Sequence, residues 1–303
     1  PGRGLKSPAA GRYFDDVAAT GAPIRKDTSV WRDAAIEVRE IAIRGGDGAP
    51  RAIEELDDEF IRCGAEALAA GGHVLAHILA SSKTGLSAPS NRAIETLIRL
   101  APDRVDVAVD ACQMRTAFAD VGALVERGWM VQISGSKFLT GPPFSGALVA
   151  PTHLRARVDR GAALLSAAPG IGRAESWSSW WSDRLPRNES LAALSFGPVF
   201  RWLPAILEAQ LFASLPRDFR RWAFEQFRTA IMKRLGESRL LRPIDLEQAS
   251  DGSDHLSRLS IVSFQVLGQR RDGSLSPLDE PCCRAVFELL NVDASGRLGQ
   301  LSG

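Results

Sequence analysis

Apolar positions along this chain follow two spacings in turn, and the alternation predicts an α/β protein. Residues 52–70 place apolar side chains at helical spacing, and Gly71-Gly72 ends the predicted helix. The run at 74–79 is apolar apart from one histidine and predicts a buried strand. Beyond it the same pattern predicts helices at 91–100 and 118–127, and strands at 105–109, 129–133 and 146–150.

Apolar strands separated by helices are typical of a mostly parallel sheet that is covered by helices on both faces. Ligands of such sheets bind where the carboxyl ends of the strands lie. We therefore expect the residues that follow 74–79, 105–109 and 129–133 to meet at one edge of the sheet. Any binding site is expected at that edge.

The second half of the chain predicts two long helices, at 190–213 and 218–235, and then a smaller α+β unit. A strand at 256–266 and a helix at 281–290 would form that unit. We expect three parts, namely an irregular and incomplete N-terminal segment at 1–30, a large domain at 31–210 and a small C-terminal domain at 211–303.

Composition and charge narrow the class of ligand. The chain has 303 residues, of which 45% are hydrophobic and 24% charged, as in an ordinary globular protein with a large core. Its 37 basic and 36 acidic residues give a net charge of +1, and there is no long basic run. This balance argues against nucleic-acid binding and favours a small-molecule ligand. No apolar run of about 18 residues predicts a membrane span.

The cysteines predict neither a metal site nor a disulfide framework. Cys63, Cys112, Cys282 and Cys283 show no CxxC spacing, and adjacent cysteines are not expected to pair with each other. Together with the lack of a signal-peptide pattern at the start, this usage favours a reducing cytoplasm. His77 lies inside a predicted strand, and we interpret it as a hydrogen-bonded core residue.

Polar residues follow each of the three predicted parallel strands. Ser81-Ser82-Lys83-Thr84-Gly85 follows the first, Asp110-Ala111-Cys112-Gln113 ends the second, and Ser134-Gly135-Ser136-Lys137 follows the third. An acid and an amine at one sheet edge suit pyridoxal phosphate. A lysine binds its aldehyde as a Schiff base, and a carboxylate keeps its ring nitrogen protonated.

In order and spacing, these blocks resemble the class V aminotransferase family of fold-type I pyridoxal-phosphate enzymes. That family includes cysteine desulfurases, selenocysteine lyases, kynureninase and several aminotransferases. The resemblance covers roughly residues 35–270. It implies a fold-type I architecture, in which a mostly parallel sheet covered by helices is joined to a small α+β C-terminal domain. It also implies a homodimer in which both subunits build each site.

The resemblance assigns a role to five residues of these blocks. Lys137 is the expected catalytic lysine, Asp110 the partner of the ring nitrogen, and Gln113 the partner of the phenolic oxygen. Ser134 and Ser136 are expected to bind the cofactor phosphate, although many relatives carry histidine in place of the second serine. Helix capping by the acid and an ordinary serine-rich turn are the structural alternatives.

Ser82 stands where many relatives carry an asparagine that contacts cofactor or substrate. Lys83 is a rival lysine, but it follows a different strand, and we interpret it as a solvated loop residue. Two groups within 166–190 have weaker interpretations. Three tryptophans are expected to pack in the core or at an interface, namely Trp177, Trp180 and Trp181. The polar residues that follow stand where relatives have a loop that reaches the neighbouring subunit, namely Arg184, Arg187 and Asn188.

Other family features are not found in this sequence. These are an upstream phosphate-binding turn, an aromatic residue that stacks on the ring, an arginine for the substrate carboxylate, and a cysteine within 292–300 that would accept sulfur. The missing cysteine favours transamination. The sequence thus predicts a pyridoxal-phosphate-dependent transferase acting on an amino acid. The alternatives are a lyase that breaks C–S, C–Se or other bonds, and a non-catalytic family member acting as a binding protein.

Overall fold

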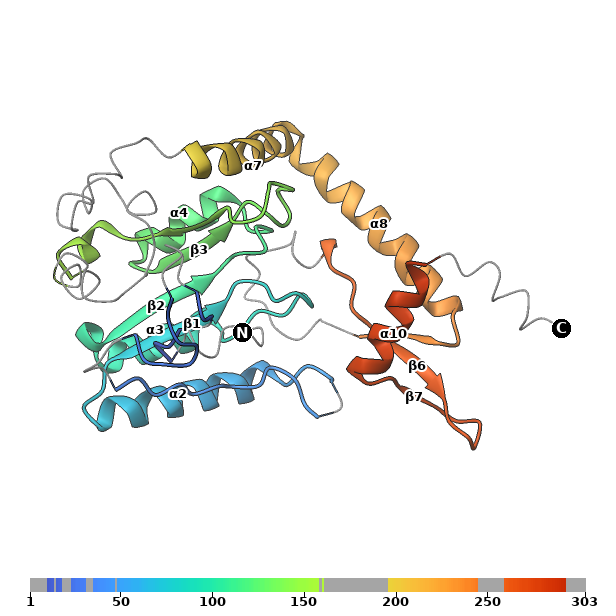
Figure 1. Ribbon diagram of the computed structural model, residues 1–303, viewed down its shortest axis with the longest axis horizontal. Helices are drawn as coiled ribbons and strands as arrows, with labels where there is room; N and C mark the ends of the chain where they lie inside the picture. The colour runs from blue at the N-terminus through green and yellow to red at the C-terminus, as the bar shows by residue number, and fades with distance from the viewer. Residues whose placement is uncertain are drawn as a thin grey trace.

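The described residues of the chain form two separate sheets (Figure 1). A computed structural model describes residues 10–13, 15–17, 23–30, 35–46, 48–157, 160, 196–244 and 259–292. One sheet has four strands and is flanked by helices, and the other has three antiparallel strands. The predicted α/β class is therefore confirmed.

The larger sheet brings three carboxyl strand ends to one edge. Its parallel strands are β1 (Val74–Leu79), β2 (Val105–Asp110) and β3 (Met130–Ser134), and β4 (Gly146–Val149) returns antiparallel. The strand order is β1-β2-β3-β4, so each strand lies beside the next one along the chain. Asp110 pairs with a residue on each neighbouring strand, Leu79 on β1 and Gln132 on β3.

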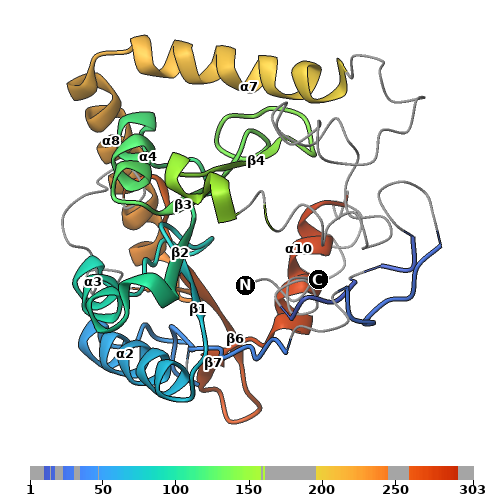
Figure 2. The same cartoon turned by 90° about the vertical axis from the view of Figure 1, so that its left-hand side faces the viewer.

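Three helices pack on the same side of this sheet (Figure 2). They are α2 (Ile53–Ala69), α3 (Asn91–Leu100) and α4 (Phe118–Glu126), and a short 3-10 turn, Pro102–Arg104, precedes β2. Helix α3 begins at Ser90, whose hydroxyl accepts the Ala93 N–H at 3.2 Å. The buried side chains shared by this helical layer and the sheet are Ala76, Ile78, Ile94, Val107, Val109, Ala111, Val121, Trp129 and Val131.

The other face of the sheet is only partly covered by the described residues. Burial alternates along β1, where Leu75 is half exposed while Ala76 and Ile78 are buried. On β4, Leu148 is also half exposed. The prediction of a strand buried throughout is therefore wrong for β1. His77 points to the open face, so its interpretation as a core histidine is also wrong.

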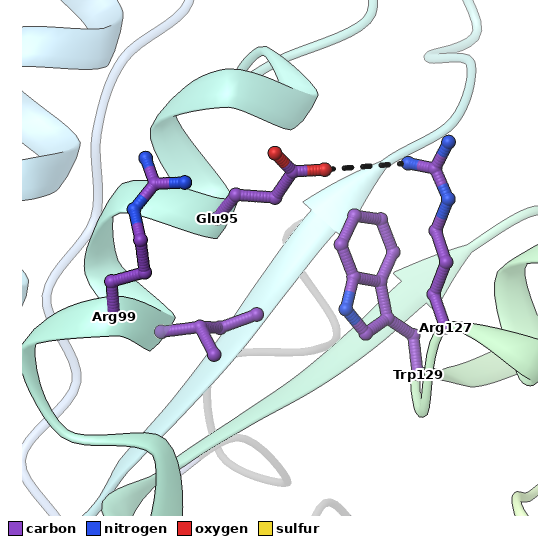
Figure 3. Close-up of a pocket in the computed structure, with 5 residues that line it drawn as sticks. Glu95, Arg99, Arg127 and Trp129 are labelled. Atoms are coloured by element: carbon purple, nitrogen blue, oxygen red, sulfur yellow. Dashed lines mark ion pairs between the residues drawn. The ribbon is translucent and has the colours of Figure 1, made fainter.

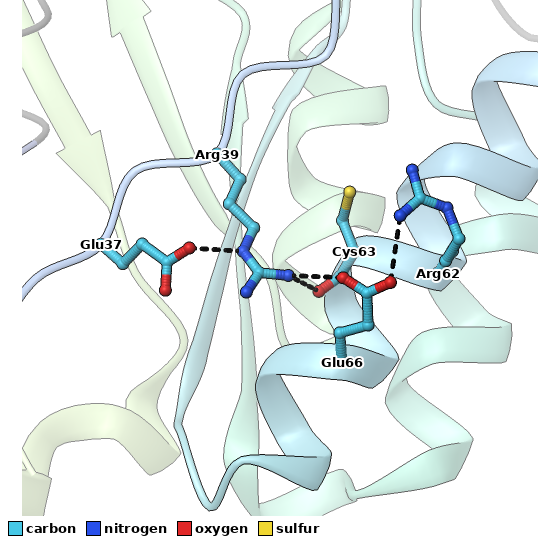
Figure 4. A network of polar contacts seen from close by, with 5 residues as sticks. All are labelled: Glu37, Arg39, Arg62, Cys63 and Glu66. Carbon is cyan, nitrogen blue, oxygen red and sulfur yellow. Dashed lines mark hydrogen bonds and ion pairs between the residues drawn. The ribbon is translucent and has the colours of Figure 1, made fainter.

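A network of exposed charges attaches the extended segment 35–43 to helix α2 (Figure 4). The Arg39 guanidinium bonds to Glu37 at 2.8 Å, to Glu66 at 3.0 Å and to the Cys63 carbonyl at 3.0 Å. Arg62 pairs with the other oxygen of Glu66 at 3.0 Å. Since water screens these charges, the network sets the path of the segment more than it adds stability.

A second ionic cluster lies at the amino-terminal end of β1 and β2. Arg157 binds both carboxylate oxygens of Asp106, at 2.7 and 2.6 Å, and the His73 ring contacts the same carboxylate at 2.7 Å. Burial opposes the charge on Asp106, but the bonds from Arg157 and His73 outweigh it, and the net pKa of this carboxyl is lowered. The ionised form of Asp106 therefore stabilises the fold.

Replacing Asp106 with asparagine is expected to reduce the free energy of unfolding by about 1 kcal/mol at neutral pH, since the pair is partly exposed to solvent. A lowered pKa contributes stability above the usual aspartate range and loses it as pH falls through the folded value. Urea unfolding at several pH values should thus show the two proteins converging below about pH 4. Asp103→Asn is the control. A gap that persists in acid would contradict the assignment.

The C-terminal part begins with helices α7 (Phe196–Ser214) and α8 (Arg217–Glu237), which follow the 3-10 turn Thr152–Leu154 and residues outside the described ranges. Helix α8 leads to the smaller sheet (Figure 1). That sheet contains β5 (Leu241–Pro243), β6 (Phe264–Gln269) and β7 (Leu275–Pro277), and helix α10 (Glu280–Leu290) follows.

The predicted strand at 256–266 starts too early, because strand β6 begins at Phe264. Phe264 pairs with Pro243 and Gln269 with Leu275, so pairing with two neighbours sets the bounds of the strand. Within the described ranges no helix is long and apolar enough to cross a bilayer. Those ranges also bring together no group of three or more metal-ligating side chains.

Candidate functional site

Asp110 ends β2 and shapes the turn that follows it. Its Oδ1 accepts the Cys112 N–H at 2.9 Å, and the Ala111 carbonyl accepts the Met114 N–H at 2.8 Å. The acid thus takes part in a local turn and does not cap helix α4, as the structural alternative had it, because that helix begins after Ala117. No cationic side chain of the described residues forms an ion pair with this half-buried carboxylate, which leaves its charge available to a ligand.

The lysine loop, residues 134–141, follows β3. Its two serine hydroxyls lie 2.9 Å apart, and the Ser136 N–H donates to Ser134 Oγ at 3.2 Å. A turn closes after the lysine, because the Thr140 N–H donates to the Lys137 carbonyl at 2.9 Å. The Lys137 side chain is exposed at the sheet edge, so its amine is accessible to a ligand from solvent.

Aromatic packing anchors the residue that follows the lysine. The Phe138 ring lies 5.2 Å from Phe212 of α7, edge to face, and 6.3 Å from Phe224 of α8. The Arg115 guanidinium lies over the Phe138 ring at 5.2 Å, so a residue just beyond the Asp110 turn touches the lysine loop. Leu139 is buried against α7. The backbone at Lys137 is therefore held by contacts on three elements.

Two glycines let the lysine loop approach helix α7 closely. A Cβ built on Gly135 would lie 2.6 Å from the Cβ of Ala205, and one on Gly141 would lie 2.8 Å from the Gly135 carbonyl. Ala205 is fully buried at this contact. The Gly-Ser-Lys sequence is thus required for packing as well as being suited to ligand binding.

Backbone strain is concentrated in these two loops. Met114 after Asp110, and Thr140 and Phe144 after the lysine, have positive φ values of 52°, 53° and 65°. Side chains other than glycine adopt this conformation at a cost of roughly 1 kcal/mol or more each. The surrounding packing overcomes that cost, and such strain is most often found at functional sites.

Cys112 lies close enough to both Asp110 and Lys137 to respond to each charge. Burial, followed by the Asp110 carboxylate, raises the pKa of the Cys112 thiol to about 12, and the Lys137 ammonium acts in the opposite direction. At neutral pH this cysteine is a neutral thiol and not a nucleophile.

The Ser82 hydroxyl is used within its own loop. It accepts the N–H groups of Leu86 at 3.0 Å and Thr84 at 3.3 Å, and Arg44 donates to the Thr84 hydroxyl at 2.8 Å. A ligand contact by Ser82 stays a prediction, as does the role of half-buried Gln113. Ser81, which the sequence interpretation missed, is buried two residues beyond Leu79, the sheet partner of Asp110.

Residues 260–263 join the site loops to the C-terminal part. Arg115 donates to Ser260 Oγ at 2.6 Å, and the Ser263 hydroxyl donates to the Thr84 carbonyl at 3.1 Å. From α8, Arg228 donates to the Ile261 carbonyl at 3.1 Å. This segment therefore contacts the loops after both β1 and β2. Nothing in the local sequence predicted contacts over such separations.

A hollow of about 310 Å³ lies away from these loops (Figure 3). Trp129, at the amino end of β3, lines it together with Arg127, whose guanidinium lies 5.6 Å from the indole and 3.8 Å from Glu95. Ile98 and Arg99 of α3 complete the wall. Because it lies at the opposite end of β3 from the lysine, this hollow is separate from the candidate site.

Several predicted residues fall outside the described part of the chain. They are Trp177, Trp180, Trp181, Arg184, Arg187 and Asn188, with most of 292–300. Among the described candidates, Asp110 ends β2 and Lys137 follows the neighbouring strand β3, on the loop that also carries Ser134 and Ser136.

Comparison with known proteins adds a remote likeness. No protein-family model matches the chain, and no curated protein matches its sequence. A solved structure from Exiguobacterium sp. 255-15, described as an aromatic amino acid beta-eliminating lyase/threonine aldolase, matches at a TM-score of 0.35 and 15% identity. The match covers 71% of this chain and 60% of that one, so it spans less than two thirds of the solved structure. A likeness this remote does not assign an activity.

Proposed function

We propose that this chain is a pyridoxal-phosphate-dependent enzyme that acts on the amine of an amino acid, with Lys137 as the residue that binds the cofactor. The observation that supports it most is the position of Asp110 and Lys137 at the carboxyl ends of the neighbouring strands β2 and β3. The charges of both groups shift the pKa of the Cys112 thiol. Neither group forms an ion pair with another described residue. The cofactor requires an amine that binds its aldehyde and a carboxylate that keeps its ring nitrogen protonated, and Lys137 and Asp110 would supply these two groups.

The donor set fits the cofactor. Asp110 keeps one carboxylate oxygen outside its turn bond, and that oxygen would accept the N–H of the pyridine ring. The hydroxyls of Ser134 and Ser136 already lie side by side, and they would donate to the phosphate. When bound, the cofactor supplies an electron sink for charge that develops at the α-carbon of the substrate.

The protein's own groups would then carry the proton transfers. The Lys137 amine, exposed at the edge, would remove and return the proton at the α-carbon as a general base and acid. The Asp110 carboxylate would keep a proton on the ring nitrogen. We propose transamination as the reaction. A lyase reaction begins with the same proton transfer, so a substrate screen must separate the two.

The test is covalent capture of the cofactor on the full chain. We expect pyridoxal phosphate to give a visible absorption band that borohydride abolishes, and peptide mass spectrometry to place the reduced adduct on Lys137. Lys137→Ala is expected to lose both signals, because Lys137 is the proposed site of attachment and its charge acts on the same thiol as Asp110.

Lys83→Ala is the matched control, since Lys83 is also an exposed loop lysine at the carboxyl end of a strand. It is expected to keep the adduct. A protein that takes up no cofactor would overturn the proposal and favour the non-catalytic binding protein. An adduct on Lys83 would overturn the assignment of Lys137.

A further inference from the structure

Arg115, on the loop after β2, makes two different contacts with one guanidinium. The guanidinium carbon lies over the Phe138 ring, 5.2 Å from its centroid. A terminal nitrogen of the same group donates to Ser260 Oγ at 2.6 Å, a short bond of the charge-assisted kind. An arginine can make both contacts at once, because a planar guanidinium attracts a ring and carries its N–H donors around its rim.

The residue before Arg115 packs on the same loop. Met114 and Leu139 are buried in one cluster with two alanines of α7, and Phe138 packs against that cluster. Two consecutive residues after β2 therefore contact two consecutive residues of the lysine loop. The positive φ of Met114, 52°, falls at this contact.

The segment that Arg115 binds is itself restrained. Next to Ser260, Ile261 is buried, and its carbonyl accepts a hydrogen bond from α8 at 3.1 Å. Two residues further on, the Ser263 hydroxyl donates to the loop after β1 at 3.1 Å. Arg115 is therefore bonded to a segment that other parts of the molecule hold in place.

The Phe138 ring is held by the C-terminal helices as well as by Arg115. Phe212 of α7 lies 5.2 Å from it, edge to face, and Phe224 of α8 lies 6.3 Å from it. Lys137 directly precedes this ring, so the position of the lysine backbone depends on where the ring packs.

We propose that Arg115 is a positioning residue, which holds the lysine loop against the loop after β2 so that Lys137 and Asp110 keep one separation. The inference rests on the proposed function, in which both groups act on one ligand. A displacement of about 1 Å can slow a reaction about 10²-fold, so this restraint would matter for catalysis. Arg115 acts on the cofactor only through the lysine loop.

Hydrogen exchange of the full chain without cofactor tests the restraint. Arg115→Met keeps an apolar stem and removes the guanidinium, and we expect the amides of residues 135–141 to exchange about tenfold faster. The N–H groups of Thr140 and Gly141 bond within this loop, so they report on it directly. Arg115→Lys is expected to resemble Arg115→Met, because an ammonium cannot replace the planar guanidinium.

Arg127→Met is the matched control for the loss of an arginine from an aromatic ring. Arg127 lies 5.6 Å from the Trp129 ring, at the opposite end of β3 from the lysine. Exchange in residues 135–141 is expected to stay at the wild-type rate in this variant. Ser260→Ala removes only one partner of the guanidinium and is expected to act in the same direction as Arg115→Met, which keeps the test decisive if Arg115→Met does not fold.

Capture of pyridoxal phosphate tests the consequence for the site. The borohydride-reduced adduct on Lys137 is expected to form about tenfold more slowly in Arg115→Met, and Phe138→Leu is expected to have a similar effect. The double variant should be no slower than either single variant, because both changes remove the same restraint.

Wild-type exchange of residues 135–141 in both Arg115→Met and Ser260→Ala would overturn the inference. So would full recovery in Arg115→Lys, which would assign the effect to charge alone, or additive effects in the double variant. A wild type that takes up no cofactor would overturn the proposed function, while the exchange rates would still decide whether Arg115 restrains the loop. The two proposals can therefore fail separately.

Discussion

Asp110→Asn is expected to slow turnover of an amino-acid substrate by about 10²- to 10³-fold while the Lys137 adduct still forms. An asparagine has nearly the same shape, and its side-chain oxygen can still accept the Cys112 N–H that shapes the turn. What it loses is the negative charge that would keep the ring nitrogen protonated. Steady-state kinetics and the absorption band, measured on the same preparation, separate the two effects.

The same variant has a consequence in the cofactor-free protein. Asp110 is one cause of the high pKa of the Cys112 thiol, about 12, so removing its charge is expected to lower that pKa. Titration of thiolate absorbance in the ultraviolet measures the change. Asp120→Asn, an exposed acid on α4, is the control and should leave both turnover and thiol unchanged. Wild-type turnover in Asp110→Asn would contradict the role of the carboxylate.

Gly135→Ala is expected to destabilise the protein by about 1–3 kcal/mol. The added Cβ would lie 2.6 Å from the Ala205 Cβ and 3.0 Å from the Ser145 hydroxyl, and Ala205 is fully buried and cannot yield without moving α7. Urea unfolding measures the loss, and cofactor capture should weaken with it because the displaced loop carries Lys137.

Gly122→Ala is the control, and it is expected to change the free energy of unfolding in the opposite direction. Gly122 lies inside helix α4, and a Cβ there would meet nothing within 4 Å. Alanine is a better helix former than glycine, so this variant is expected to be more stable by about 1 kcal/mol. Equal stability of Gly135→Ala and wild type would mean that the lysine loop and α7 are not in close contact.

Periodicity alone was sufficient to predict the larger sheet. The predicted strand at 74–79 and helix at 91–100 match β1 and α3 at both ends. Elements β2, α4 and β4 differ by one residue at one end, and α2 and β3 differ by one residue at each end. These elements depend on residues that are close together in the sequence, so the local spacing of apolar residues is enough to predict them. Strand β6 was misplaced because its ends depend on pairing with β5 and β7, which no local pattern encodes.

The candidate site was predictable only in part. Placing Asp110 and Lys137 at one edge required just the strand order and the rule for parallel sheets. The exposure of Leu75 and His77 was not predictable, because it depends on what packs over the second face. Nor was the use of the Ser82 hydroxyl inside its own loop. Whether Gln113 and the serines contact a cofactor stays a prediction.

The contacts of residues 260–263 affect how the protein is made. Arg115 bonds to a residue 145 positions later, and Thr84 to one 179 positions later. A chain emerging from the ribosome can pair β1, β2 and β3 while these late residues are still unsynthesised. The loops after β1 and β2 gain these restraints only after residues 260–263 have been translated. Newly made protein therefore acquires its sheet well before it acquires a finished site.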